Sequence, residues 1–218
     1  LATLPFLALP GRGPVAFIIK SYTRAMRYAL HLFAGIKTEA RGKDRLPEGA
    51  FIIAAKHQSW GDGFLIYPEV TTLAFVTGAH LARLPLVGGI LRKLGAIVID
   101  TCGGGERKAA SLAEGMGRAK KDGRRILIYP EGHLAPIDHH FRYKPGVWHM
   151  QKAMDVPVVP VATNLGLFWT QESHEKTPGT AVIEFLDPIP AGLPKDEFMA
   201  RLRDAVETRT AELVAEAR

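Results

Sequence analysis

Cysteine is nearly absent from this sequence. Cys102 is the single cysteine among 218 residues, so an internal disulfide cannot form. The composition suits a reducing compartment. The stretch DTCGGGE around Cys102 also contains no histidine, and a cysteine nucleophile needs a base close by. A disulfide-stabilised secreted fold is therefore excluded, and thiol chemistry is disfavoured.

Long uninterrupted hydrophobic runs are missing as well. The most apolar stretch, LATLPFLALPGRGPVAFII, is broken by Pro5, Pro10, Arg12 and Pro14. A membrane-spanning helix needs about 20 predominantly apolar residues. We therefore expect neither a spanning helix nor a secretory signal. The sequence also has no internal repeat and no G-x-x-x-x-G-K-[ST] phosphate loop, which argues against a repeat protein and a P-loop nucleotide site.

The composition that remains is that of a globular protein with a basic surface. Hydrophobic residues make up 47% and charged residues 23% of the chain, which allows a packed core. The net charge of +6 favours an anionic partner, either a nucleic acid, an anionic lipid or a phosphorylated substrate. The basic run RAKKDGRR lacks the interleaved aromatic residues of a base-stacking surface, so we expect no nucleic-acid partner.

Residues 1–38 are predicted to form a hydrophobic and basic N-terminal segment. Within it, residues 15–33 have the apolar spacing of a helix. The predicted apolar side carries Ile18, Tyr22, Met26, Ala29 and Phe33, and the other side carries Lys20, Arg24, Arg27 and His31. Two interpretations stay open: a helix that covers the core, or an amphipathic helix in an anionic membrane interface. The aromatic residues and the preceding apolar stretch favour membrane association.

The remaining residues, 39–218, predict a single α/β domain. Short apolar runs typical of strands covered on both faces occur at 51–55, 73–77, 96–99, 126–129, 158–162 and 181–186. Helical patterns occur at 86–94, 106–121, 146–154 and 195–217. Strands and helices alternate, which predicts a largely parallel central sheet flanked by helices.

A histidine and an aspartate follow the first of these strands, in the stretch KHQSWGD. Positions five residues apart on one helix lie about 140° apart, so His57 and Asp62 can meet only across a loop that leads into a helix. In that geometry the carboxylate accepts the imidazole Nδ1–H and leaves Nε2 free as a general base. Ser59 is too close in sequence to act as the nucleophile, which leaves that role to a substrate hydroxyl.

The spacing H-x₄-D alone does not decide between catalysis and structure. It occurs a second time at His133 and Asp138. A structural interpretation therefore stays open, in which Asp62 is a helix N-cap and His57 is a hydrogen-bonded core histidine.

A second stretch, ILIYPEGH, favours the catalytic interpretation of His57 and Asp62. The two stretches resemble the glycerolipid acyltransferases typified by lysophosphatidic acid acyltransferase, whose signature is N-H-x-S-x-x-D followed by F-P-E-G-T-R. Two further blocks, PLVGGILRKLGAIVID and VPVVPVATN, match in the same order, and the likeness runs from residue 40 to 190. Four ordered blocks are far more specific than any one of them.

The resemblance implies acyl transfer to a lysolipid. His57, oriented by Asp62, would deprotonate the free hydroxyl of the lysolipid, which then attacks the thioester of acyl-CoA or acyl carrier protein. The thioester is a co-substrate, and no bound cofactor or metal is expected. The candidate residues for acceptor binding or oxyanion stabilisation are Ser59, Glu131, Gly132 and His133. Glu131 has a structural alternative as a carboxylate that satisfies local backbone donors.

Two positions depart from the family pattern. The arginines that the family uses against the acceptor's phosphate are replaced by Thr101 and Leu134. Either another basic residue has taken over, or the acceptor carries no phosphomonoester, as in lyso-ornithine lipid and other lyso-aminolipids. The candidate replacements are Arg107, Lys108, Arg142 and Lys144. We place 1-acylglycerol-3-phosphate first, because a displaced basic residue is a small change.

Three further interpretations bear on the partners. The histidines of the stretch HLAPIDHH match no defined zinc spacing, so a polar loop is expected there instead of a metal site. A lipid- or nucleic-acid-binding protein without catalysis is the competing functional class. The acyltransferase hypothesis predicts a peripheral or monotopic protein on the cytoplasmic face of the cell membrane, in contact with anionic lipid.

Overall fold

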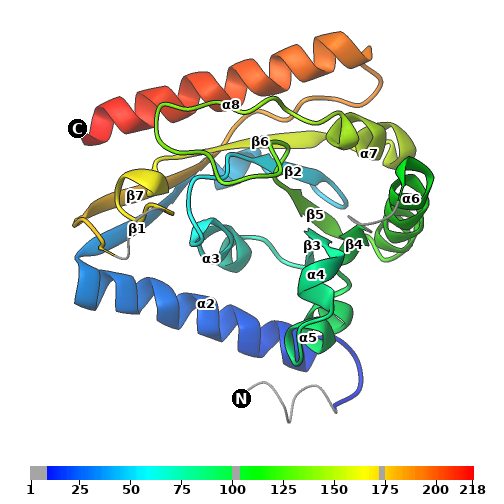
Figure 1. Cartoon of the computed structure of the whole chain (residues 1–218), viewed down its shortest axis with the longest axis horizontal. Coiled ribbons are helices and arrows are strands. Elements are labelled where there is room, and N and C mark those ends of the chain that lie inside the picture. Colours follow the sequence, from blue (N-terminus) through cyan, green and yellow to red (C-terminus); the bar gives the residue numbers. More distant parts are fainter. Residues whose placement is uncertain (1–8, 100–103, 172–174) are drawn as a thin grey trace.

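A seven-stranded sheet runs through the computed structural model, which describes residues 9–99, 104–171 and 175–218 (Figure 1). The strands are β1 (Ile36–Arg41), β2 (Ile52–Ala55), β3 (Leu73–Gly78), β4 (Ile97–Ile99), β5 (Arg125–Ile128), β6 (Val158–Thr163) and β7 (Gly179–Phe185). Their order is β1-β7-β6-β2-β5-β3-β4. The β6–β7 pair is antiparallel, and the other pairs are parallel. The predicted α/β fold with a largely parallel sheet is thus confirmed.

Helices cover both faces of this sheet. The α-helices are α2 (Gly13–Ala34), α3 (Asp62–Ile66), α4 (Ala79–Ala82), α5 (Val87–Leu94), α6 (Gly105–Lys121), α7 (Gly146–Met154) and α8 (Lys195–Ala217). Short 3-10 helices lie at η1 (Lys43–Arg45), η2 (Tyr67–Glu69) and η3 (Leu165–Leu167). In Figure 1, α8 lies along one side of the sheet and α2 along the other, with α3 between α2 and the strands.

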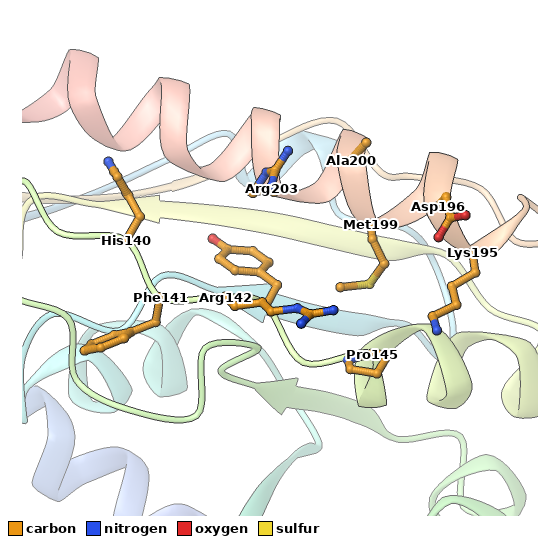
Figure 2. A pocket seen from close by; sticks show the side chains of 10 residues that line it. His140, Phe141, Arg142, Pro145, Lys195, Asp196, Met199, Ala200 and Arg203 are labelled. Atoms are coloured by element: carbon orange, nitrogen blue, oxygen red, sulfur yellow. The ribbon is translucent and has the colours of Figure 1, made fainter.

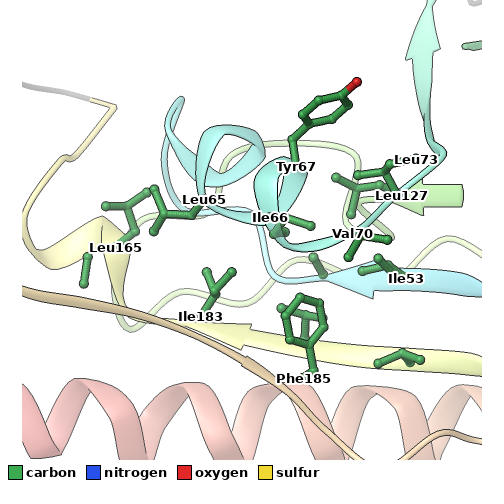
Figure 3. Packing of buried hydrophobic residues seen from close by; sticks show 14 of the residues in the cluster. Ile53, Leu65, Ile66, Tyr67, Val70, Leu73, Leu127, Leu165, Ile183 and Phe185 are labelled. Atoms are coloured by element: carbon green, nitrogen blue, oxygen red, sulfur yellow. The ribbon is translucent and has the colours of Figure 1, made fainter. Parts of the chain in front are cut away.

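The buried core is divided by the sheet into two layers. Ile53 and Ala55 of β2 pack in the layer shared with α2 and α3, whereas Ile52 and Ala54 pack in the layer shared with α7 and α8. Figure 3 shows part of the first layer, where Ile66 of α3 lies near Ile53. Neither side of β2 faces water, so both sides are apolar, which explains why its sequence lacks polar alternation.

Strand β1 was missed by the sequence analysis. Its sequence, IKTEAR, mixes charged and apolar residues, and Lys37 and Glu39 are exposed in the structure. β1 is an edge strand and pairs in parallel with β7. An edge strand has less apolar burial than a central strand, so the apolar-run criterion passes over it.

Helix α2 forms as predicted, and its predicted apolar side is only partly buried. Its buried residues are Val15, Thr23 and Leu30, whereas Phe33 of the predicted apolar side is 84% exposed. The helix is apolar around most of its circumference, so periodicity could not select the side that packs. In the described part of the chain, no helix is both long and apolar enough to cross a bilayer.

Candidate functional site

Two loops meet at the carboxyl ends of the neighbouring strands β2 and β5. After β2, residues 57–61 turn sharply into α3, and the backbone N–H of Ala135 donates to the carbonyl of His57 at 2.7 Å. Ala135 belongs to the loop that follows β5, so the two sequence blocks are joined by this hydrogen bond. Ligand sites of open parallel sheets lie outside the carboxyl ends of strands, and this pair of loops occupies that position.

His57 and Asp62 contact each other across the turn. His57 Nδ1 lies 2.9 Å from Asp62 Oδ2, and the same oxygen accepts the backbone N–H groups of Gln58 at 2.8 Å and Ser59 at 3.0 Å. Because a carboxylate oxygen accepts, Nδ1 carries the proton, and a neutral ring then has an unprotonated Nε2. Asp62 is fully buried, whereas the His57 side chain is 22% exposed. The imidazole is therefore anchored by a buried carboxylate and is itself partly accessible to solvent.

Asp62 is not the N-cap of α3. The N-cap position is Gly61, and Asp62 is the first residue of the helix. Its carboxylate reaches back to the N–H groups of the turn and to the imidazole. The structural interpretation of Asp62 as an N-cap is therefore replaced by a carboxylate that holds the turn and the ring together.

Tyr129 fixes the plane of the imidazole. Its ring stacks on His57 with a centroid distance of 3.8 Å and an interplanar angle of 13°. Burial, together with the nearby charge of Asp62, raises the pKa of Tyr129 well above its usual range, so the phenol stays neutral. Tyr129 is a site residue that the sequence patterns above do not indicate. Its place before Pro130, where the related signature has an aromatic residue, was the available signal.

The turn after His57 tolerates only small residues at two positions. Ser59 is fully buried, and its Oγ accepts the N–H of Gly61 at 3.1 Å. A Cβ atom on Gly61 would lie 2.7 Å from the ring of Trp169, which is too close for any side chain. Ser59 thus lies inside the turn and does not face a substrate in this conformation.

Glu131 lies in a buried ion-pair network on the other face of the sheet from His57. Lys56 Nζ is 3.2 Å from each Glu131 oxygen and 2.9 Å from both oxygens of Glu207 on α8. The N–H of Phe141 also donates to Glu131 at 3.0 Å. Burial raises the pKa of Glu131, although Lys56 opposes this. The carboxylate therefore holds the loop after β5, as in the structural alternative for this residue.

Gly132 and Lys144 lie against each other. Gly132 has φ of +71°, and a Cβ atom there would collide with the ammonium of Lys144. The backbone N–H of Lys144 donates to the carbonyl of Pro130 at 2.9 Å, which fixes the lysine beside this turn. Leu134 follows in the same loop and is partly buried. Of the basic residues considered in the sequence analysis, Lys144 is therefore the one that lies beside the turn with Glu131 and Gly132.

The other predicted residues lie elsewhere. Arg107 is exposed on α6, and Arg142 lies on the loop that faces α8. Thr101 and the side chain of Lys108 lie outside the described residues. His133 is exposed, with its ring 5.8 Å from that of Phe141.

Two histidines of the predicted polar loop, His139 and His140, have different partners. His139 contacts Phe141 edge to face, at a centroid distance of 4.7 Å, and His140 Nδ1 lies 2.6 Å from Glu207 Oε2. Among the described residues, no three histidine, cysteine or acidic side chains are grouped to hold a metal ion.

Comparisons with known proteins identify the family of this chain. The family model described as Acyltransferase matches residues 37–164, which is more than half of the chain. The 1-acyl-sn-glycerol-3-phosphate acyltransferase of Pseudomonas aeruginosa is 29% identical over 210 residues, covering 95% of this chain and 80% of that protein. The enzyme of the same name from Saccharomyces cerevisiae is 25% identical, and the match covers 83% of this chain and 62% of the yeast protein.

A solved structure shows the same fold. The crystal structure of the 1-acyl-sn-glycerophosphate acyltransferase PlsC from Thermotoga maritima superposes with a TM-score of 0.77 at 23% identity. The match covers 93% of this chain and 80% of that one. The two sequence blocks that contain His57 and Glu131 fall inside the residues that the family model matches. The chain therefore belongs to the acyltransferase family and is an enzyme of that class.

Proposed function

We propose that this enzyme transfers a fatty acyl group from acyl-CoA or acyl carrier protein to the free hydroxyl of 1-acylglycerol-3-phosphate. The observation that carries the proposal is the contact between His57 Nδ1 and Asp62 Oδ2, which leaves Nε2 available as the base on a side chain that is 22% exposed. The relatives from Pseudomonas and Saccharomyces are named 1-acyl-sn-glycerol-3-phosphate acyltransferases, which supports the choice of acceptor.

The reaction follows from the protonation state of the histidine. His57 Nε2 accepts the proton of the lysolipid hydroxyl while the oxygen attacks the thioester carbonyl. The tetrahedral intermediate collapses, the carbon–sulfur bond breaks, and the thiolate takes the proton back from the imidazolium. Asp62 stabilises that imidazolium and keeps the ring oriented throughout. The lysolipid supplies the nucleophile, so no protein hydroxyl is needed.

Lys144 is proposed to contact the phosphate of the acceptor. Its ammonium lies against Gly132, two residues before Leu134, which stands where the related signature has arginine. An ammonium binds phosphate as a point charge, without the two-pronged geometry of arginine. Lys144 could thus supply the positive charge for the phosphate that the two family arginines supply elsewhere.

A direct comparison of acceptors tests this assignment. The purified enzyme is given one acyl donor with either 1-acylglycerol-3-phosphate or lyso-ornithine lipid, and the acylated product is quantified. We expect higher kcat/KM for the phosphate acceptor, and an increase in KM for that acceptor of about tenfold in Lys144→Ala. Higher kcat/KM for the aminolipid would overturn the acceptor assignment and leave the acyltransferase chemistry intact.

We also propose that the enzyme is peripheral or monotopic on the cytoplasmic face of the cell membrane. Five large apolar side chains of α2 are exposed: Phe17, Tyr22, Tyr28, Leu32 and Phe33. Arg24 and His31 are exposed on the same helix. A cluster of this composition is expected to bury its apolar residues in an anionic interface.

The segment around α4 and α5 extends this surface. In Figure 1, α5 lies beside the N-terminal end of α2. Four of its exposed residues are apolar: Leu81, Leu84, Leu86 and Val87. The two elements together present apolar side chains to a membrane from which a lysolipid can enter.

A further inference from the structure

A cavity separates the N-terminal half of α8 from the loop before α7. We call it the α8 groove, and it has a volume of about 540 Å³. Figure 2 shows Arg142 on the loop side and Lys195, Met199 and Arg203 on the α8 side. The volume lies in the range of pockets that bind small molecules and cofactors. The reaction at His57 does not use this cavity.

The α8 groove is strongly basic. Arg142, Lys195 and Arg203 line it, against the single carboxylate of Asp196. None of these three cations forms an ion pair or side-chain hydrogen bond with another described residue, although many other surface arginines of the chain do. Unpaired cations gathered in a concave site attract anionic ligands, because a cavity focuses their field.

Two helix N-termini add to this positive potential. Pro145, the residue before α7, and Lys195, the first residue of α8, both line the α8 groove. Neither helix has a side-chain hydrogen bond at its N-cap. Free backbone N–H groups at a helix start favour phosphate.

The α8 groove also offers apolar contacts. Met199 and Phe141 line it together with the cations. A polarisable thioether, an aromatic ring and guanidinium planes are all partners for a purine base. The cavity therefore suits a ligand that joins several phosphates to a nucleobase, and a simple inorganic anion would leave much of it empty.

The α8 groove is coupled to the catalytic loop through Glu207. Tyr143 of the groove donates its hydroxyl to Glu207 at 2.8 Å, and His140 contacts the other oxygen. Glu207 in turn holds Lys56, which directly precedes His57. One ion-pair network thus supports both the wall of the groove and the start of the catalytic turn.

We propose that the α8 groove binds the 3′-phospho-ADP end of a CoA thioester. This inference rests on the proposed function, because it assigns a donor to the same enzyme. The phosphates of CoA lie against Arg142, Lys195 and Arg203, with the adenine among the apolar side chains, and the flexible pantetheine arm carries the thioester to His57. Helix α8, which borders the groove, lies across the sheet from α2 (Figure 1). The α8 groove therefore faces water when α2 contacts lipid.

A binding experiment separates this proposal from the catalytic one. The inactive variant His57→Ala is titrated with CoA and with adenosine 3′,5′-bisphosphate by calorimetry, and both are expected to bind. Adding Lys195→Gln and Arg203→Gln should weaken CoA binding by about tenfold or more. Asp196→Asn should tighten it about twofold, since it removes the opposing charge. Arg201→Gln, on the same helix but outside the groove, is the matched control and should leave binding unchanged.

Kinetics provide the second readout. In the otherwise wild-type enzyme, Lys195→Gln with Arg203→Gln should raise KM for acyl-CoA about tenfold or more, with kcat and the KM for acyl-pantetheine unchanged. An equal loss with acyl-pantetheine would contradict a nucleotide site, and so would unaltered CoA affinity. Turnover with acyl carrier protein but no CoA binding would overturn the proposal in favour of a protein donor. Absence of turnover with every donor, together with CoA binding, would defeat the proposed function alone.

Discussion

At the scale of single residues, Asp62 has two roles. One oxygen of its carboxylate accepts hydrogen bonds from the imidazole and from two backbone N–H groups of the turn. The same contacts therefore fix the tautomer of His57 and the path of the chain around it. This explains why a spacing of five residues, which fails on a continuous helix, places the two side chains in contact here.

Replacement of the buried Lys56 should lower the stability of the fold strongly. Lys56 is 1% exposed, and its ammonium forms ion pairs with two carboxylates, those of Glu131 and Glu207. Lys56→Met leaves these carboxylates without their cation, and we expect a loss of about 3–5 kcal/mol in the free energy of unfolding, measured with urea. Adding Glu131→Gln should recover part of the loss. A decrease below about 1 kcal/mol, the size of a surface pair, would contradict the buried network.

At the scale of elements, α2 packs directly on the catalytic segment. Tyr22 of α2 contacts Phe64 of α3 edge to face at a centroid distance of 5.8 Å, and Phe64 stacks on Trp169. Arg27 of α2 forms an ion pair with Glu69, which lies just after α3. The helix proposed to meet the membrane is thus attached to the helix that begins with Asp62.

The attachment of α2 should depend on pH through Glu69. Burial alone would raise the pKa of Glu69, but hydrogen bonds from Arg27 and Lys43 hold it below its usual range. A carboxylate with a lowered pKa stabilises the fold above its unfolded pKa and loses that contribution as pH falls through the folded value. Urea unfolding between about pH 5 and pH 3 should therefore show a shallower loss of stability in Glu69→Gln than in the wild type. Equal slopes would show that the ion pair contributes nothing.

Much of this arrangement could be predicted from sequence because it is local. The strands buried on both faces, the long helices and the turn between His57 and Asp62 depend on neighbouring residues, and the structure has them where the patterns placed them. The partner of Lys56 could not be predicted, since Glu207 lies 151 residues away and on another element. The packed side of α2 was equally undetermined, because apolar residues occur around most of the helix.

At the scale of the whole molecule, two surfaces of opposite character lie on either side of the sheet. Helices α2 and α8 lie on opposite sides of the sheet (Figure 1). The exposed apolar residues belong to α2, and the basic α8 groove borders α8. In our proposal a lipid acceptor enters from the first side and a water-soluble donor from the second. The carboxyl ends of β2 and β5 lie between them, where the His57 side chain is partly exposed.

The α2 surface should control membrane binding without affecting the fold. Phe17 and Phe33 are 69% and 84% exposed, so Phe17→Asp with Phe33→Asp removes little packing. We expect affinity for anionic phospholipid vesicles, measured by sedimentation, to fall by about tenfold or more. Ala211→Asp on α8 adds a negative charge far from α2 and serves as the control. Unchanged vesicle binding in the double variant would exclude α2 as the membrane contact.

The most direct test of the whole account is the rate of acyl transfer by His57→Ala. The assay uses whichever lysolipid the wild-type enzyme acylates best, at saturating donor, with thermal unfolding as a check that the variant is folded. We predict that kcat falls by about 10²- to 10⁴-fold, the usual contribution of a general base. A folded variant that retains kcat within about threefold of the wild type would contradict the assignment of His57 as the base.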